Sequence, residues 1–474
     1  MWKAIPFIKF CKPMEAINRR EFLKKLGLGG VAMAGTSMLA SCGEEQKAQR
    51  ALGTTFSERE VPTDKMTYRT TPTTGDKVSL LGYGMMRLPQ DKDGNIDQEQ
   101  VNRLVDYALA HGVNYFDTSP VYCKGQCEPA TGIALSRHPR DSYFVAAKLS
   151  NFNPKTYARE ESVKMYRKSF ELLKVDVIDY YLLHSVGGGG MKNFSERYLD
   201  NGILDFLMEE RAKGYIRNLG FSYHGDVEVF DWCLANHDKY HWDFVQIQMN
   251  YVDWRHGNEQ NKRNQDALYL YTELEKRGIP AVIMEPLLGG RLSNLPTHVI
   301  ERLKERRPQD SVASWAFRFC GHWPGVLTAL SGMTYMEHLQ DNIRTFSPCE
   351  PLSQDELDFL EETAQLILHY PTVPCNECQY CMPCPYGIDI PTIFHYYNKC
   401  VNEGSVPRSN EDPDYFRLRR NYLIGYDRAL EKVRQADHCV GCGACTPHCP
   451  QNIRIPRELQ RIDRFVENLR QFKI

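Results

Sequence analysis

Eight cysteines near the C-terminus stand in two short runs, and their spacing suits iron–sulfur chemistry. In spacings this short, successive thiolates reach different irons of one cubane cluster. Eight thiolates therefore predict two [4Fe–4S] clusters, with all eight cysteines as ligands. The two runs are Cys375-x2-Cys378-x2-Cys381-x2-Cys384-Pro385 and Cys439-x2-Cys442-x2-Cys445-x3-Cys449-Pro450.

Zinc is the alternative occupant, since paired C-x2-C motifs also bind Zn²⁺. A zinc site needs four ligands and rarely has a third evenly spaced cysteine before Cys-Pro, which favours clusters. The runs resemble those of two-cluster ferredoxins, in which the fourth cysteine of each run ligates the other cluster. Two residues separate Cys381 from Cys384, whereas three separate Cys445 from Cys449. Two alternatives therefore stay open: that Cys384 ligates in a different way, and that one cluster is a [3Fe–4S] cluster or is labile.

Upstream of the cysteine runs, short apolar runs alternate with amphipathic stretches. Eight strands that are each followed by a helix predict an α/β fold, a (β/α)8 TIM barrel over residues 65–346. A doubly wound open sheet is the alternative, but Gly82-Tyr83-Gly84 lacks the third glycine of a dinucleotide fingerprint. The predicted strands are 78–83, 115–117, 143–148, 177–183, 216–222, 244–250, 281–285 and 326–331, with helical patterns at 98–110, 157–173 and 196–213.

The barrel pattern ends at residue 346, and a different organisation follows. Residues 347–374 form a linker, with two prolines within 347–353 and a predicted helix at 354–370. Between the cysteine runs, 393–401 and 415–435 have helical patterns. We therefore expect 375–474 to form a small, mostly α-helical ferredoxin-like domain.

Four residues that could handle a proton lie at or just after predicted strand ends: Asp117, Tyr122, Lys148 and His184. Together they resemble the catalytic set of the aldo-keto reductases. In that family an Asp ends the second strand, a Tyr follows five residues later, a Lys closes the third strand and a His closes the fourth. The resemblance covers residues 65–346 and implies an oxidoreductase that reduces a carbonyl or oxidises an alcohol with NADP or NAD. The matching residues are Asp117, Tyr122, Lys148 and His184.

The chemistry of that family implies a role for each residue. Hydride addition to a carbonyl builds negative charge on oxygen, which Tyr122 would neutralise as an acid. Lys148 would lower the pKa of the phenol from about 10, and Asp117 would orient Lys148. His184 would donate a hydrogen bond to the substrate oxygen or relay the proton. Each residue alone has an ordinary structural explanation, but four together at strand ends favour catalysis.

The resemblance also implies a nucleotide site. After the eighth strand, a glycine turn leads into a helix N-terminus that can hold an anion, although an ordinary capped loop would look similar. Tyr223 replaces the family's usual Asn, and no aromatic residue stands at the end of the seventh strand. No Lys or Arg lies between Gly332 and Asp341, so NADP and NAD stay open. The implied residues for the nicotinamide carboxamide are Ser222 and Gln248. Those implied for the rest of the nucleotide are Gly332, Thr334, His338, Asp341 and Asn342.

Two features near the predicted catalytic residues have no assigned role. Cys123 and Cys127 flank a tight loop directly after Tyr122. They could be a redox pair, substrate contacts or a coincidence of composition. Four glycines at 187–190 follow His184 and could hinge a lid or form a plain flexible loop.

The first 42 residues have the pattern of an export signal. Arg19-Arg20 and the weakly apolar run after them resemble a twin-arginine (Tat) signal, and Leu39-Ala40-Ser41-Cys42 resembles a lipobox. A basic amphipathic helix is the alternative. The Tat route carries proteins already folded around their cofactors, so clusters would cross intact. We expect residues 43–64 to be a tether and the mature chain to be a periplasmic or cell-surface lipoprotein, anchored in the membrane through Cys42.

Composition narrows the remaining possibilities. The 474 residues are 42% hydrophobic and 25% charged, with a formal net charge of -2. These values suit a globular protein of two or three domains, and without a basic stripe no nucleic-acid partner is expected.

The two predicted halves differ in their electron chemistry. Nicotinamide passes two electrons as a hydride, whereas each cubane takes one, and the sequence has no flavin motif to bridge them. Three interpretations stay open. The first is a carbonyl or alcohol oxidoreductase whose clusters link it to a redox partner. The others are a dehydrogenase with structural clusters and a non-catalytic ferredoxin-like carrier on a degenerate barrel.

Overall fold

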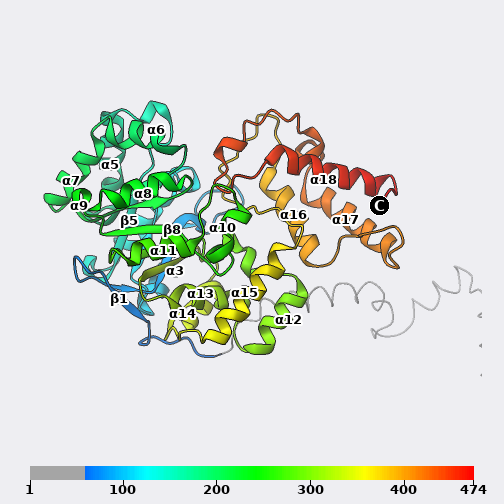
Figure 1. The fold of residues 1–474 in the computed structure, drawn as a ribbon, viewed down its shortest axis with the longest axis horizontal. Helices are drawn as coiled ribbons and strands as arrows, with labels where there is room; N and C mark the ends of the chain where they lie inside the picture. The colour runs from blue at the N-terminus through cyan, green and yellow to red at the C-terminus, as the bar shows by residue number, and fades with distance from the viewer. Residues whose placement is uncertain (1–58) are drawn as a thin grey trace, which may run out of the picture. The chain divides into compact units, whose positions relative to one another are not determined.

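The computed structural model describes residues 59–474, which form a barrel and a helical C-terminal region (Figure 1). The predicted export signal and most of the predicted tether lie outside the described residues. Within residues 59–474, no helix has both the length and the apolar character needed to cross a membrane.

Eight parallel strands close into the predicted barrel, in the order β10-β3-β4-β5-β6-β7-β8-β9. Consecutive strands are neighbours, so the carboxyl ends of all eight meet at one mouth. The strands are β3 (Leu81–Gly84), β4 (Tyr115–Asp117), β5 (Phe144–Leu149), β6 (Ile178–Val186), β7 (Ile216–Tyr223), β8 (Phe244–Gln248), β9 (Ala281–Met284) and β10 (Val326–Ser331).

An antiparallel hairpin, β1 (Tyr68–Thr70) and β2 (Lys77–Ser79), precedes the barrel. Val78, which we expected in the first barrel strand, lies in this hairpin. It packs with Tyr115 and Phe244, from the first positions of their strands, in the apolar barrel interior. The hairpin therefore helps to fill the end of the barrel opposite the mouth.

Helices cover the barrel where the amphipathic patterns predicted them, with one exception. The predicted helix 196–213 is interrupted, because Gly202 adopts a left-handed φ of 65° and begins a new helix there. The helices of this part are α3 (Gln98–Ala110), α4 (Cys127–Leu135), α5 (Arg159–Leu173), α6 (Gly190–Phe194), α7 (Ile203–Ala212), α8 (Val227–Ala235), α9 (His237–Tyr240), α10 (Asp253–Gln260), α11 (Ala267–Glu275), α12 (Thr297–Arg306), α13 (Val312–His322) and α14 (Met336–Phe346).

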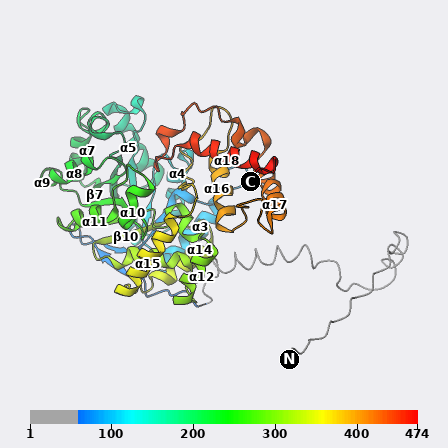
Figure 2. The ribbon, with the colours of Figure 1, turned by 45° about the vertical axis from the view of Figure 1, so that its right-hand side comes forward.

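The C-terminal region is helical, as predicted. α15 (Gln354–Leu368) begins at Ser353, whose side chain forms a capping box with Glu356. Both views show α16 (Ile390–Asn402), α17 (Tyr415–Ala429) and α18 (Ile455–Arg470) gathered together (Figure 2). These three helices surround a second apolar core, and the cysteine runs lie in the irregular segments that α16 and α17 separate.

Candidate active site

The four residues predicted to be catalytic come together at the barrel mouth. Asp117, Lys148 and His184 lie on the neighbouring strands β4, β5 and β6. The Lys148 ammonium donates to Asp117 Oδ1 at 2.5 Å and to the Thr118 carbonyl at 2.9 Å. The Tyr122 ring centroid lies 5.0 Å from Lys148 Nζ and 6.1 Å from the His184 ring centroid.

The electrostatics at Tyr122 differ from our expectation. Burial, followed by the nearby Asp117 carboxylate, raises the pKa of Tyr122 well above its ordinary value. Lys148 does not reverse this, because its charge is offset by Asp117 at 2.5 Å. The phenol is therefore protonated in this state, which suits an acid that gives its proton to a developing oxyanion.

His184 is buried, and two serine hydroxyls lie beside its Nδ1. Its Nδ1 lies 2.6 Å from Ser150 Oγ and 3.4 Å from Ser119 Oγ. Burial, followed by the Lys148 charge, lowers its pKa well below the ordinary value, so the imidazole is neutral near pH 7. When Ser150 donates to Nδ1, the proton resides on Nε2, and the ring becomes a hydrogen-bond donor.

His224 is a further polar residue at the mouth, which our sequence analysis did not select. It follows β7, and its ring centroid lies 6.3 Å from that of His184. Burial lowers its pKa to about 4, and its buried Nδ1 has no hydrogen-bond partner among residues 59–474. Its position two residues after Ser222 was the only sequence feature that could have identified it.

The residues predicted for the carboxamide lie on adjacent strands. The Ser222 hydroxyl accepts the Ser185 N–H at 2.9 Å, and Gln248 ends β8. The Gln248 amide donates to Asp253 at 2.7 Å, while its oxygen faces Gln451 of the second cysteine segment at 3.5 Å. Both ends of the Gln248 amide are thus engaged within the protein.

The residues predicted for the rest of the nucleotide follow β10. Thr334 donates its hydroxyl to the Arg87 carbonyl at 2.8 Å, and a Cβ on Gly332 would lie 3.1 Å from the Arg87 side chain. His338 lies in the first turn of α14. The last two predicted residues are buried and bonded internally: Asp341 accepts from Ser311 at 2.6 Å and Asn342 donates to Ser331 at 2.9 Å.

The first cysteine loop contacts the barrel mouth, a contact that the sequence gave no means to predict. Asn376 donates its side-chain amide to Glu285, directly after β9, at 2.9 Å. The Arg87 guanidinium, after β3, donates to the Asn376 carbonyl at 2.5 Å. A Cβ on Gly289 would clash with the Asn376 backbone. Tyr380 belongs to the same loop, and its phenol is among the groups that raise the pKa of Tyr122.

Cysteines from both runs meet at one cavity in the C-terminal region. Cys375, Cys378 and Cys381 line a small cavity together with Cys449 from the second run. The remaining Cys384 lies near the second run instead. Burial, and after it the nearby Cys439 and Cys384 thiols, raise the pKa of Cys445. Cys449 thus lies with three cysteines of the first run, while Cys384 lies within electrostatic range of Cys445.

The grouping of thiols around this cavity suits an iron–sulfur cluster. The irons of a cubane each take one thiolate, and four thiols line the cavity. All eight cysteines of the two runs are free thiols.

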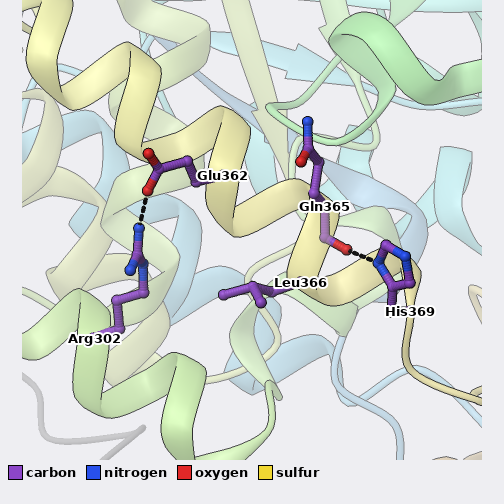
Figure 3. Close-up of a pocket in the computed structure, with 5 residues that line it drawn as sticks. All are labelled: Arg302, Glu362, Gln365, Leu366 and His369. Atoms are coloured by element: carbon purple, nitrogen blue, oxygen red, sulfur yellow. Dashed lines mark hydrogen bonds and ion pairs between the residues drawn. The ribbon is translucent and has the colours of Figure 1, made fainter.

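A second cavity lies away from both groups of residues. It is an open depression between α12 and α15, where Arg302 and Glu362 form an ion pair (Figure 3). Leu366 is 39% exposed there, and His369 Nδ1 donates to the Gln365 carbonyl at 2.6 Å. The depression contains neither a predicted catalytic residue nor a predicted ligand.

Comparisons with known proteins agree with this geometry. Residues 80–365 match the model of the aldo/keto reductase family, and residues 374–454 match that of a 4Fe-4S dicluster domain. The chain is 24% identical over 315 residues to an uncharacterized oxidoreductase, YqkF, of Bacillus subtilis (strain 168), covering 60% of this chain and 92% of that protein. It is 22% identical over 320 residues to an L-galactose dehydrogenase of Arabidopsis thaliana, covering 64% and 95%.

A solved structure gives the same result for the fold. An aldo-keto reductase from Klebsiella pneumoniae in complex with NADPH superposes with a TM-score of 0.51 at 21% identity. The match covers 64% of this chain and 96% of that one. At this identity the likeness concerns the barrel fold alone.

Proposed function

This chain belongs to the aldo/keto reductase family, and from that premise we propose that it reduces a carbonyl or oxidises an alcohol at the mouth of its barrel. The observation that carries the proposal is the convergence of Asp117, Tyr122, Lys148 and His184 on adjacent strand ends. The substrate is a small molecule. Because one relative is named as a sugar dehydrogenase, aldoses are the first class to test.

In this proposal the chain's own residues handle the proton and the oxyanion. The substrate oxygen binds between the Tyr122 hydroxyl and His184 Nε2. His184 donates a hydrogen bond through Nε2, because Ser150 occupies Nδ1. Tyr122 gives its proton to the oxygen during reduction and takes one during alcohol oxidation. Lys148 and Asp117 form the buried ion pair beside the phenol and take up the change in charge.

A nicotinamide nucleotide, NADP or NAD, would supply or accept the hydride. Ser222 and Gln248 suit the carboxamide by their types and adjacent strand ends, and Gln248 would have to release Asp253 or Gln451 to bind it. The barrel order places the end of β9 between Gln248 and the Gly332 turn. Asn376 lies against Gly289 there. Binding of a whole dinucleotide therefore requires the first cysteine loop to shift from Gly289.

The C-terminal region holds two [4Fe–4S] clusters in this proposal. Cys375, Cys378, Cys381 and Cys449 ligate the first cluster. The second takes the other four cysteines, with ligands Cys384, Cys439, Cys442 and Cys445. The first cluster is then the one beside the barrel mouth, and the clusters exchange electrons with a redox partner. The protein acts outside the cytoplasm, after Tat export and lipidation of Cys42.

Substitution of the phenol tests the catalytic assignment. The Tyr122→Phe holoprotein should lose at least 100-fold in kcat with NADPH or NADH and a panel of aldoses, aldehydes and ketones, because the proton donor is removed. Tyr181→Phe is the matched control, since Tyr181 is also a fully buried tyrosine but lies elsewhere. Full turnover by Tyr122→Phe would refute the proposed role.

A further inference from the structure

Arg197 is a buried cation whose charge no carboxylate balances. It lies in a π-helical turn, Ser195–Leu199, and is 3% exposed. Among residues 59–474 no acidic side chain forms an ion pair with it, and the hydrogen bonds of its guanidinium go to uncharged oxygens. Burying an arginine without a counter-ion costs free energy, so this placement calls for an explanation beyond packing.

Two of these bonds hold the end of β6, where His184 lies. The guanidinium donates through one Nη to the His184 carbonyl at 2.6 Å and through the other to the Ser185 carbonyl at 3.1 Å. The Tyr198 hydroxyl, 2.6 Å from the first Nη, donates to the same His184 carbonyl at 2.9 Å. Ser185 has a left-handed φ of 59°, and the pairing of β6 with β7 shifts register here. Arg197 therefore fixes an irregular strand end that carries His184.

The remaining bonds hold the end of β5, where the hydrogen-bond partner of the His184 ring lies. Arg197 Nε donates to Asn151 Oδ1 at 3.3 Å, and the Asn151 amide donates to the Arg197 carbonyl at 3.1 Å. Asn151 directly follows Ser150, whose hydroxyl lies 2.6 Å from His184 Nδ1. One guanidinium thus joins the two strand ends that carry the partners of the Ser150–His184 hydrogen bond.

A series of hydroxyls gives that hydrogen bond its direction. The Val121 N–H, which can only donate, donates to Ser119 Oγ at 3.4 Å. Ser119 Oγ lies 2.9 Å from Ser150 Oγ, so the Ser119 proton can go to Ser150 and the Ser150 proton to His184 Nδ1. The proton of the neutral imidazole is then on Nε2.

We propose that Arg197 is a positioning residue for His184. By holding the two strand ends together it keeps Ser150 within reach of Nδ1, and it thereby keeps the Nε2 proton available to the substrate oxygen. The inference rests on the proposed function, because it concerns the support of one residue of that site. Arg197 itself is not expected to touch the substrate.

The first test asks whether Arg197 acts through His184. Arg197→Lys keeps the charge and loses the planar fork that reaches both strand ends. With NADPH and the best substrate of the panel of aldoses, aldehydes and ketones, the holoprotein variant should lose about tenfold or more in kcat with little change in KM, because His184 acts on the oxyanion of the transition state. In a His184→Ala background the same substitution should change kcat by less than about twofold. A tenfold loss that persists in that background would show a general structural effect and overturn the proposal.

Arg140 offers a matched control, since it joins the segments that lead into the same two strands. Its guanidinium donates to the Tyr143 carbonyl before β5 at 3.0 Å and to the Val177 carbonyl before β6 at 2.8 Å, and it pairs with Asp179. Arg140→Lys should leave kcat within about twofold of the wild type, because these bonds lie at the opposite ends of the strands from His184. An equal loss of kcat in both arginine variants would contradict a specific role for Arg197.

Tyr198→Phe is a milder change that covers the case in which Arg197→Lys does not fold. It removes one hydrogen bond to the His184 carbonyl and keeps the ring. The loss in kcat should be about threefold, as expected for one hydrogen bond, and it should vanish when His184 is alanine. An unchanged kcat in Tyr198→Phe together with an unchanged kcat in Arg197→Lys would overturn the proposal.

Chemical denaturation gives a readout that needs no turnover. The urea midpoint of the holoprotein with both Arg197→Lys and Ser150→Ala should fall by less than the sum of the two single shifts, because both changes break the same unit. Additive shifts would overturn the proposal. Full turnover by His184→Ala would instead refute the role of His184 in the proposed function, whereas full turnover by Arg197→Lys beside an inactive His184→Ala would refute only the positioning role.

Discussion

Burial controls protonation at the residues around the proposed site. Our sequence analysis assigned Lys148 the task of lowering the pKa of Tyr122, whereas in this state burial and then Asp117 raise that pKa. The lysine is committed to Asp117 at 2.5 Å, and the phenol loses its hydration without gaining an unpaired cation. The types of the four residues were predictable from sequence, but the balance of their charges depends on distances that only the fold sets.

Glu128 gives a prediction at the same scale. It is buried beside Cys127 and accepts the Ser169 hydroxyl at 2.8 Å. Burial raises its pKa from 4.5 to about 7. The folded chain therefore holds this proton more tightly than the unfolded chain, and stability is lost as the pH rises from about 4.5 to about 7.

Glu128→Gln should remove this loss. Above pH 7 the variant should be more stable than the wild type by up to about 3 kcal/mol, and the difference should vanish near pH 4.5. Chemical denaturation of the holoprotein at pH 5 and pH 8 would measure it. Glu99→Gln changes an exposed carboxylate and serves as the control. An equal difference at both pH values would contradict the explanation.

At the scale of elements, periodicity predicted the barrel well because each strand and helix is a local pattern. All eight predicted strands are present, and α3 spans the residues predicted for it. The hairpin residue Val78 and the break at Gly202 were missed, since a turn within an apolar or amphipathic stretch leaves the pattern on both sides intact. The contact of Asn376 with Gly289 joins segments 87 residues apart, and no local pattern encodes it.

That contact predicts a competition between the first cysteine loop and the nucleotide. Asn376→Ala removes the amide that binds the Glu285 carboxylate, so moving the loop should cost about 1.5–3 kcal/mol less. Binding of NADPH or NADH should tighten roughly tenfold or more. Fluorescence titration of the holoprotein would measure the Kd.

The matched control uses another contact between the same two parts of the chain. Asn402 of α16 donates to the Asn294 carbonyl at 2.6 Å, away from the strand ends. Asn402→Ala should leave nucleotide affinity unchanged. If Asn376→Ala behaves in the same way, the loop does not obstruct the nucleotide.

At the scale of the whole molecule, the proposed ligand sets join the two cysteine runs, because each run supplies its fourth cysteine to the cluster of the other run. Cys449 lies with Cys375, Cys378 and Cys381, and Cys384 lies within electrostatic range of Cys445. The resemblance to two-cluster ferredoxins implies that the fourth cysteine of each run ligates the other cluster. The shorter spacing before Cys384 does not prevent this, because Cys384 still lies near Cys445. We therefore expect two complete clusters of four thiolates each.

Selective loss of each cluster tests the pairing. Cys449→Ala should lower the iron content by about half and make Cys375, Cys378 and Cys381 accessible to alkylation, because these thiols lose their cluster. Cys384→Ala should instead expose Cys439, Cys442 and Cys445. Iron analysis with peptide mapping would distinguish the two sets. Exposure of the second set by Cys449→Ala would contradict the exchange.

Our proposal joins a carbonyl or alcohol site in the barrel to clusters that take part in electron transfer, and the most direct measurement follows the clusters during turnover. The holoprotein is reduced with dithionite, desalted anaerobically, supplied with NADP⁺ and mixed with an accepted aldehyde or aldose. Cluster absorbance should recover as the alcohol forms in the wild type, and it should not recover in Tyr122→Phe. Carbonyl reduction by NADPH at full rate, with the clusters remaining reduced throughout, would contradict the claim and leave the clusters a structural role.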